Sequence, residues 1–223
     1  MQNKNIIRFK FKKKDGLKYI AHLDLQRTVA RIIKRSRIPV RYTEGFNPHP
    51  KMVFALPLSV GSESECELVD VYIVFDEKRV GEPLYTPEEF KRDITPNLPK
   101  GLDFVDAFYP DKPFTEIKSA TYQVEADLKS EEDIVPLVKT ILSSPIEVMK
   151  KSKAGDKVVD VSPLIFNFEV SQRAEKLFIN LELSAAQNNY LNPEYIITGL
   201  KNNSTISEVL DYYTIKRTEI IFN

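Results

Sequence analysis

Two histidines and the basic residues around them are the side chains best suited to chemistry. His22, Asp24 and Arg27 lie close together in one stretch of the chain. An imidazole has an ordinary pKa that suits proton transfer near neutral pH. At a helix start the dipole favours a neutral His22, which could act as a base or bond a phosphate-bearing ligand. Equally, His22 could pack against the helix start while Asp24 binds first-turn amides or pairs with Arg27.

A second candidate is the segment 45–52, in which Pro48 and Pro50 flank His49. A stiff loop would present His49 and Lys51 at fixed positions and lower the ordering cost of binding. Basic and aromatic residues alternate here, a mixture that suits contact with phosphates and stacking on bases. Alternatively, Asn47 only stabilises the turn. The predicted nucleic-acid or partner surface comprises Arg27, Arg31, Arg35, Arg41, Phe46, Asn47, His49 and Lys51, and the catalytic candidates are His22, Asp24 and His49.

The charge distribution is asymmetric although the 223 residues balance 32 Lys and Arg against 32 Asp and Glu. Residues 1–51 hold 14 basic and 3 acidic residues, and the remainder holds 18 and 29. This split predicts a basic surface that meets a polyanion. The alternative is a solvated basic helix face that the acidic segment offsets. The basic outer face of the first strand, Arg8, Lys10 and Lys12, could extend the surface or only protect a sheet edge.

Cysteine and histidine are too scarce for several classes of site. One Cys and two His cannot alone build a Cys/His zinc site or ligate an iron–sulfur cluster, so no metal and no cofactor is predicted. Glu63, Glu65 and Glu67 could bind a hard cation, or line the solvent side of a strand. Cys66 lies among these acids, which raise a thiol pKa, so we do not predict a nucleophile.

The class of protein follows from patterns that the sequence lacks. It has no apolar run long enough for a membrane span, and no apolar signal core follows Met1. We therefore expect no membrane association and a cytoplasmic location. A single Cys also fits a reducing compartment.

The elements that would position these residues follow from periodicity. The first half predicts a strand over 6–13, a helix over 22–37 that Pro39 ends, short strands over 39–42 and 52–58, a turn over 59–64, a strand over 67–75, a helix after Thr86 to Ile94 and a strand over 102–109. Leu25, Val29, Ile32 and Ile33 would face the core, and Arg27, Arg31, Lys34 and Arg35 form a neighbouring stripe.

The second half predicts a similar order. We expect strands over 120–127, 145–150, 158–165, 166–170, 177–183 and 212–222, a helix to Leu142 with Ser130 as its cap, and short helices over 192–200 and 204–210. The whole predicts an α+β fold of two ferredoxin-like (βαββαβ-type) domains in tandem, residues 1–112 and 113–223, with mostly antiparallel sheets and helices on one face. Lys157 and Asp160 could form a structural pair in the second domain.

Three stretches carry a resemblance to a known family. They are LKYIAHLDLQR at 17–27, YTEGFNPHPKM at 42–52 and ALPLSVGSESE at 55–65. They resemble the uncharacterised radical SAM-linked protein family, whose members occur beside or fused to a radical SAM protein with a cobalamin-binding-like region. The resemblance weakens in the second half, where 157–163 looks like a family motif. It implies that the motif positions are His22, Asp24, Arg27, residues 45–51, Lys157 and Asp160. Where the family has Ser before its His, this chain has Ala21, so a side-chain cap is not expected there.

Three functions stay open on this reading. The resemblance and the basic segment favour an accessory RNA-binding or substrate-presenting partner of a radical SAM protein encoded nearby, acting in RNA modification. Because such an enzyme needs three cluster cysteines, this chain would be its partner. One alternative is a metal-independent RNA-processing enzyme in which His22 or His49 is the base and Lys51 stabilises phosphate charge. The other is a protein–protein adaptor.

Overall fold

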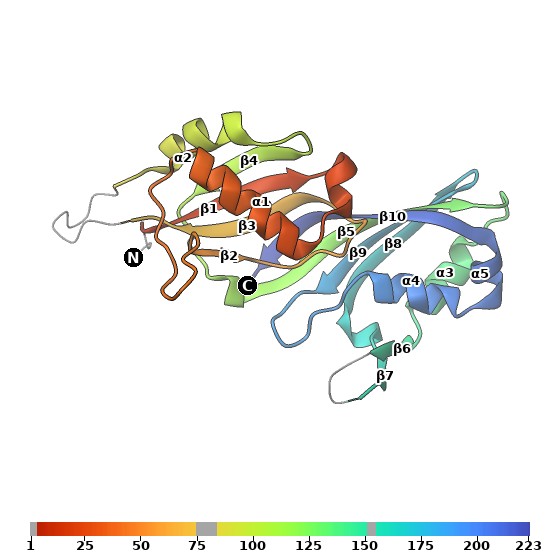
Figure 1. Cartoon of the computed structure of the whole chain (residues 1–223). Helices are drawn as coiled ribbons and strands as arrows, with labels where there is room; N and C mark the ends of the chain where they lie inside the picture. Colours follow the sequence, from red (N-terminus) through yellow and green to blue (C-terminus); the bar gives the residue numbers. More distant parts are fainter. Residues whose placement is uncertain (1–3, 75–83, 151–154) are drawn as a thin grey trace. The chain divides into compact units, whose positions relative to one another are not determined.

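Two units of strands and helices make up the protein, which we analysed as a computed structural model that describes residues 4–74, 84–150 and 155–223 (Figure 1). The units span Met1–Phe114 and Thr115–Asn223. This boundary lies two residues beyond the one that the sequence predicts, after residue 112. The fold is α+β, and the described strand pairs within each unit are antiparallel.

The first unit runs strand–helix–strand–strand–helix–strand, in the predicted order. Its strands follow the order β4-β1-β3, and β2 pairs with β3. The elements are β1 (Ile6–Lys13), α1 (His22–Arg35), β2 (Met52–Phe54), β3 (Glu63–Tyr72), α2 (Pro87–Ile94) and β4 (Leu102–Phe108).

One face of the first unit's sheet carries its core. Ile7, Phe9 and Phe11 alternate along β1, and all three are buried. The rings of Phe9 and Phe11 lie 4.9 Å apart between centroids. Both helices contribute to the same cluster, α1 through four apolar residues at helical spacing and α2 through Phe90 and Ile94. The period-2 strand and the amphipathic helix are therefore confirmed as the core layers.

The other face of β1 is an ion-pair surface, so the expected basic outer face is wrong for Arg8. Arg8 is 2% exposed and donates from Nε and Nη2 to the Asp70 carboxylate at 2.7 and 2.9 Å. Its guanidinium also lies 4.0 Å from the centroid of the Phe114 ring. Lys12 pairs with Glu65 in β3. Acidic side chains on β3 thus neutralise the charges of Arg8 and Lys12, and the sequence alone does not reveal these partners.

Strand β3 begins at Glu63, within the predicted turn, because Ser64 pairs with Lys13 beyond a bulge in β1. Of the three acids there, Glu67 is buried, so a wholly solvent-facing row is wrong. Strand β2 ends at Phe54, four residues before the predicted end, and the predicted strand over 39–42 is reduced to isolated bridges. The predicted end at Phe75 lies outside the described residues.

Helix α2 begins as its sequence predicts. Thr86 accepts a hydrogen bond from the Glu89 backbone, and the Glu89 side chain accepts one from the Thr86 backbone, which completes a capping box. In the same helix, hydrogen bonds from Arg92 and from the Tyr85 hydroxyl lower the pKa of Asp93 to about 2. The Asp93 carboxylate is therefore more acidic in the folded chain than in an unfolded one.

The second unit has a four-stranded sheet in the order β10-β5-β9-β8 and a separate β6-β7 hairpin. Figure 1 shows α3, α4 and α5 gathered on one side of this sheet. The elements are β5 (Ile117–Leu128), α3 (Val135–Leu142), β6 (Glu147–Lys150), β7 (Lys157–Asp160), β8 (Ile165–Arg173), β9 (Lys176–Ser184), α4 (Glu194–Lys201), α5 (Ser204–Val209) and β10 (Leu210–Phe222).

Helix α3 begins at Val135, so the predicted cap at Ser130 is wrong. The side chain of Gln172 in β8 holds the preceding segment out of the helix. It accepts from the Ile134 amide at 3.2 Å and donates to the Glu132 carbonyl at 2.9 Å. Pro136 in the first turn lacks the amide hydrogen that a longer helix would need. A contact distant in sequence therefore overrides the local capping signal.

Helix α4 approaches Ile146 closely at Gly199. A Cβ atom added at Gly199 would lie 2.3 Å from the Ile146 Cγ2 atom, well inside van der Waals contact. Ile146 is 3% exposed and has little room to move. Gly199 therefore has a packing role that outweighs the poor helix propensity of glycine.

Every helix in the described part of the chain is too short or too polar to cross a membrane.

Candidate functional site

The segment 41–51 folds back on itself beside β3, and its ends are fixed by backbone hydrogen bonds. The Lys51 amide donates to the Arg41 carbonyl at 2.7 Å, and the Arg41 amide donates to the Tyr72 carbonyl at 2.8 Å. A further bond at 2.9 Å joins the Thr43 amide to the His49 carbonyl. Residues 44–49 are exposed on the loop so formed. The stem therefore presents a short exposed loop, which we call the 44–49 loop.

His49 is held in one orientation at the end of this loop. Its Nδ1 lies 3.2 Å from the Asn47 carbonyl and 3.1 Å from the Thr43 hydroxyl. The carbonyl can only accept, whereas the hydroxyl can donate or accept. In the tautomer that donates from Nδ1 to the Asn47 carbonyl, Nε2 is an acceptor or a base for a ligand. Asn47 thus orients His49 through its backbone as well as belonging to the turn.

Helix α1 presents a basic stripe opposite its buried face. Arg27, Arg31, Lys34 and Arg35 are exposed, whereas the four core residues of the helix are buried. Arg27 pairs with Asp24 at 2.9 Å, and both side chains are more than half exposed. An exposed i,i+3 pair of this kind is worth a few tenths of a kcal/mol. Asp24 is thus placed beside Arg27.

The other three cations of the stripe form no ion pair within residues 4–74, 84–150 and 155–223. On β1 and the turn after it, by contrast, several basic residues have acidic partners. Lys14 pairs with Asp103 at 2.6 Å, which raises the pKa of Lys14. Three cations without an ion pair in the described residues, Arg31, Lys34 and Arg35, therefore lie together on the exposed side of α1.

A cavity of about 230 Å³ lies between α1 and the segment that leads into β2. Residues from the helix form one side of it, and His49, Pro50, Met52 and Phe54 form the other. The helix residues are Leu23, Gln26, Arg27 and Ala30. The cavity thus brings the loop histidine next to the basic stripe, and Arg27 belongs to both.

His22 lies behind this cavity. Its Nε2 is 2.9 Å from the Gln26 amide nitrogen, and its ring meets Phe54 edge-on with 5.6 Å between centroids. Ala21 gives α1 no side-chain cap, as its type implies. His22 therefore supports two residues of the cavity wall.

Exposed aromatic rings accompany the cations. Phe46 at the loop is fully exposed, and Tyr42 is about half exposed. Lys34 Nζ lies 5.7 Å from the centroid of the Tyr42 ring, and Lys51 Nζ lies 4.6 Å from that of Tyr72. These separations are within the reach of cation–π attraction. Apolar rings and cations therefore share one surface, which we call the α1–loop surface; it comprises Arg27, Arg31, Lys34, Arg35, Arg41, Tyr42, Phe46, His49 and Lys51.

The second-unit motif lies in its own hairpin and has a structural environment. Asp160 accepts from the Ser162 amide at 2.9 Å, from the Ser162 hydroxyl at 3.0 Å and from the Ile146 amide at 3.0 Å, and these contacts lower the pKa of Asp160. Lys157 is exposed and stands opposite Lys150 in the β6–β7 register. Asp160 therefore fixes the chain around the hairpin through backbone amides, in place of the expected pair with Lys157.

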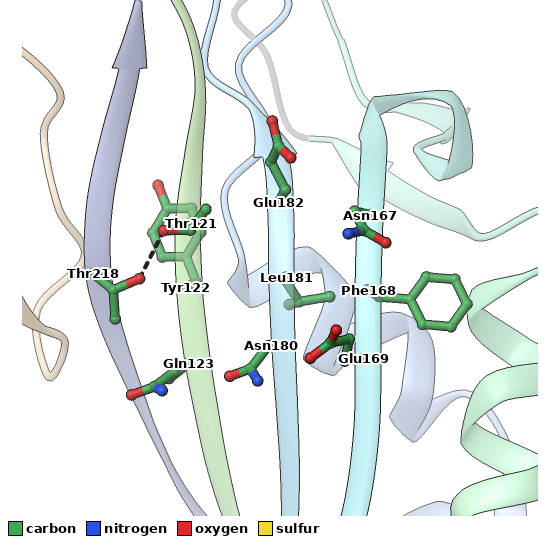
Figure 2. A pocket seen from close by; sticks show the side chains of 10 residues that line it. All are labelled: Thr121, Tyr122, Gln123, Asn167, Phe168, Glu169, Asn180, Leu181, Glu182 and Thr218. Atoms are coloured by element: carbon green, nitrogen blue, oxygen red, sulfur yellow. Dashed lines mark hydrogen bonds between the residues drawn. The ribbon is translucent and has the colours of Figure 1, made fainter.

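A larger, shallow cavity of about 360 Å³ lies on the second unit's sheet (Figure 2). Two rows of side chains cross β5, β9 and β8 there. They are Thr121, Glu182 and Asn167, then Gln123, Asn180 and Glu169. Ser119 donates to Glu182 at 2.6 Å. The described lining residues include carboxylates and amides but no Lys or Arg. This lining disfavours phosphate binding, whereas the basic α1–loop surface favours it.

Sequence reasoning missed the apolar half of the first cavity. Leu23, Ala30, Met52 and Phe54 were read as ordinary helix or strand residues. Gln26 follows His22 by one helical turn, and that spacing was the available signal for their contact. The described residues contain no group of three His, Cys, Asp or Glu side chains that could hold a metal ion.

Comparisons with known proteins give distant likenesses. A chain in the structure of an H/ACA RNP bound to a substrate RNA containing 2'-deoxyuridine is 9% identical, with a TM-score of 0.49 over 97% of this chain. This chain spans about half of that one, 48%. An unknown protein from Galdieria sulphuraria is 10% identical, with a TM-score of 0.26 over 96% of this chain and 98% of its own. Both scores are too low to inform on function.

No curated protein matches the chain. The sequence model of one bacterial family, by contrast, covers most of it. That match runs over residues 7–193 and so includes α1, the 44–49 loop and the Asp160 hairpin. The chain belongs to this family, which is described as an uncharacterized protein conserved in bacteria (DUF2344).

Proposed function

We propose that the chain is an RNA-binding subunit that holds an unpaired RNA segment on its α1–loop surface for a partner enzyme. The observation that carries the proposal is the joint exposure of Phe46 on the neighbouring loop and of Arg31, Lys34 and Arg35 on α1, which form no ion pair within the described residues. Cations attract any phosphate backbone, whereas exposed rings stack only on bases that are free of a duplex. The combination favours single strands and loops over double helices.

The architecture supports the same proposal. We infer that both units are ferredoxin-like, because each sheet places its first strand between its last and its third. In the second unit the β6–β7 hairpin is then an insertion. The first unit's helices cover one sheet face, and α1 exposes its basic stripe on the side away from the core.

Binding measurements test the proposal directly. An RNA stem-loop and a blunt duplex of equal length would be titrated by fluorescence anisotropy at low salt. We expect the stem-loop to bind more tightly, and Phe46→Ala to weaken the stem-loop by about tenfold while it hardly affects the duplex. Leu84→Ala, at another exposed apolar side chain of the same unit, is the matched control. Absence of binding to both RNAs would refute the proposal.

The resemblance of three stretches to the radical SAM-linked family supports a choice of partner enzyme. We propose a radical SAM protein encoded nearby, and a pull-down with and without ribonuclease tests it. If ribonuclease abolishes capture of the radical SAM protein, RNA joins the two proteins. Capture that persists in ribonuclease and high salt, together with absence of RNA binding, would favour the adaptor function instead.

The oriented imidazole of His49 favours one further candidate, a metal-independent RNA-processing enzyme. Nε2 of a neutral His49 could accept a proton from a ribose hydroxyl, and Lys51 could stabilise phosphate charge. Incubation of RNA with the protein in the presence of a chelator distinguishes this enzyme from the RNA-binding subunit. Cleavage that is lost in His49→Ala would establish the enzyme. RNA that stays intact would favour the RNA-binding subunit.

A further inference from the structure

We infer that the cavity between α1 and β2 is a pocket for one unpaired nucleobase. The inference rests on the proposed RNA binding and adds to it a single site where one base leaves the strand. The pocket walls are Leu23, Gln26 and Ala30 of α1 and His49, Met52 and Phe54 opposite them.

The size of the cavity fits one flat ring system. Its volume is about 230 Å³. This is several times the ~30 Å³ that a water molecule occupies in the liquid, and less than the 300–1,000 Å³ typical of pockets for drug-sized ligands. A base fits such a space, whereas the attached ribose and phosphates would stay outside.

The chemistry of the walls also matches a base, which has apolar faces and a polar edge. Ala30, Pro50 and Leu23 are apolar, and Phe54 and Met52 add an aromatic ring and a thioether that pack well on ring systems. The polar groups in the lining are the Gln26 carboxamide, the His49 imidazole and the Arg27 guanidinium. A carboxamide supplies a donor beside an acceptor, the pattern with which Gln and Asn read base edges.

These polar groups are positioned before any ligand arrives. The Gln26 amide nitrogen lies 2.9 Å from His22 Nε2, which directs its carbonyl oxygen and second hydrogen elsewhere. His49 is fixed through Nδ1 by Asn47 and Thr43. Groups that are already ordered lose little entropy on binding, so the site can select a base at low cost.

Charge at the rim distinguishes a nucleotide from an apolar peptide side chain. Arg27 lines the cavity, and Arg31 and Arg35 continue from it along the exposed side of the helix. A strand that inserts one base would lay its neighbouring phosphates along this stripe. A partner's leucine or phenylalanine would fill the cavity but would leave the cations unmatched.

Abasic scanning of a bound RNA loop tests the pocket. One abasic nucleotide is moved through the loop, and the dissociation constant is measured at each position. For the unchanged protein we expect one position where loss of the base weakens binding by about tenfold. In Ala30→Leu, which fills the cavity with a good helix former, the intact RNA should bind about tenfold more weakly and that positional dependence should vanish.

Two further variants separate the possible outcomes. Arg31→Gln should weaken all RNAs of the scan equally, because it removes a cation and leaves the cavity. Gln26→Leu keeps the apolar walls, so it should retain binding but reduce discrimination among the four bases at the sensitive position. Equal affinity of Ala30→Leu and the unchanged protein for intact RNA, or equal affinity for every abasic RNA, would overturn the pocket. Failure of all RNAs to bind would instead overturn the proposed function.

Discussion

The salt dependence of RNA binding is the sharpest consequence of the cations on the α1–loop surface. Each phosphate that a protein neutralises on a single strand contributes a slope of about −0.7 to the logarithm of affinity against the logarithm of salt. The α1–loop surface offers six exposed or half-exposed cations: Arg27, Arg31, Lys34, Arg35, Arg41 and Lys51. If all contact phosphate, the slope is about −4, and affinity falls roughly 300-fold between about 50 mM and about 200 mM salt.

The perturbation that tests this value is the triple change of Arg31, Lys34 and Arg35 to Gln. These side chains are exposed and form no ion pair in the described chain, so their loss should leave the fold intact. The slope should fall to about −2, and affinity should then change only about 20-fold over the same salt range. Anisotropy titrations at several salt concentrations measure both slopes.

A matched control uses three exposed lysines of the second unit, Lys118, Lys129 and Lys139, changed to Gln. We expect the control to keep the unchanged slope, because these residues lie outside the α1–loop surface. Equal slopes for the α1 triple variant and the unchanged protein would refute the assignment of the stripe to phosphate contacts. A reduced slope in the control would show that binding is diffuse and not confined to α1.

Three predictions concern stability and use urea denaturation. Gly199→Ala should lower the free energy of unfolding by about 1–3 kcal/mol through overpacking. Adding Ile146→Leu, which removes the Cγ2 atom, should recover part of that loss. A gain in stability in Gly199→Ala would contradict the predicted clash. Asp70→Ala should cost about 3–5 kcal/mol, because it leaves Arg8 charged and buried without its carboxylate; a cost below about 1 kcal/mol would contradict this. The lowered pKa of Asp93 stabilises the folded state at pH values above the unfolded pKa of about 3.9, and this contribution is lost as the pH falls through about 2. Asp93→Asn should therefore make the free energy of unfolding depend less on pH in that range. An unchanged dependence would contradict the prediction.

The elements that the sequence predicted well are those whose signals are local. Helix α1 was placed within two residues because its apolar spacing is regular and Pro39 follows it closely. Helix α2 carries its own capping box at Thr86. Helix α3 failed in the opposite way, because Gln172, distant in sequence, holds the residues before Ile134 by their backbone groups. A local capping signal carries no information about such a contact.

The same distinction between local signals and long-range contacts applies to the candidate site. The stiff loop around His49 and the stripe of α1 could be read directly, since proline content and helical spacing are local properties. The cavity between them could not be read, because Met52 and Phe54 become its wall only when β2 is set against α1. Likewise, the burial of Arg8 depends on Asp70, whose strand register the sequence does not state.

The ion pairs determine which cations of the basic N-terminal segment can attract a polyanion. As a sequence, its charge could be spread over strand, turn and helix alike. In the folded chain, Arg8 and Lys12 find carboxylates on β3, and Lys14 finds one at Asp103. Cations that are already matched gain little from an added phosphate, whereas Arg31, Lys34 and Arg35 of α1 have no carboxylate partner among the described residues. A polyanion is therefore drawn to the helix and its neighbouring loop, the elements that also carry the exposed ring of Phe46.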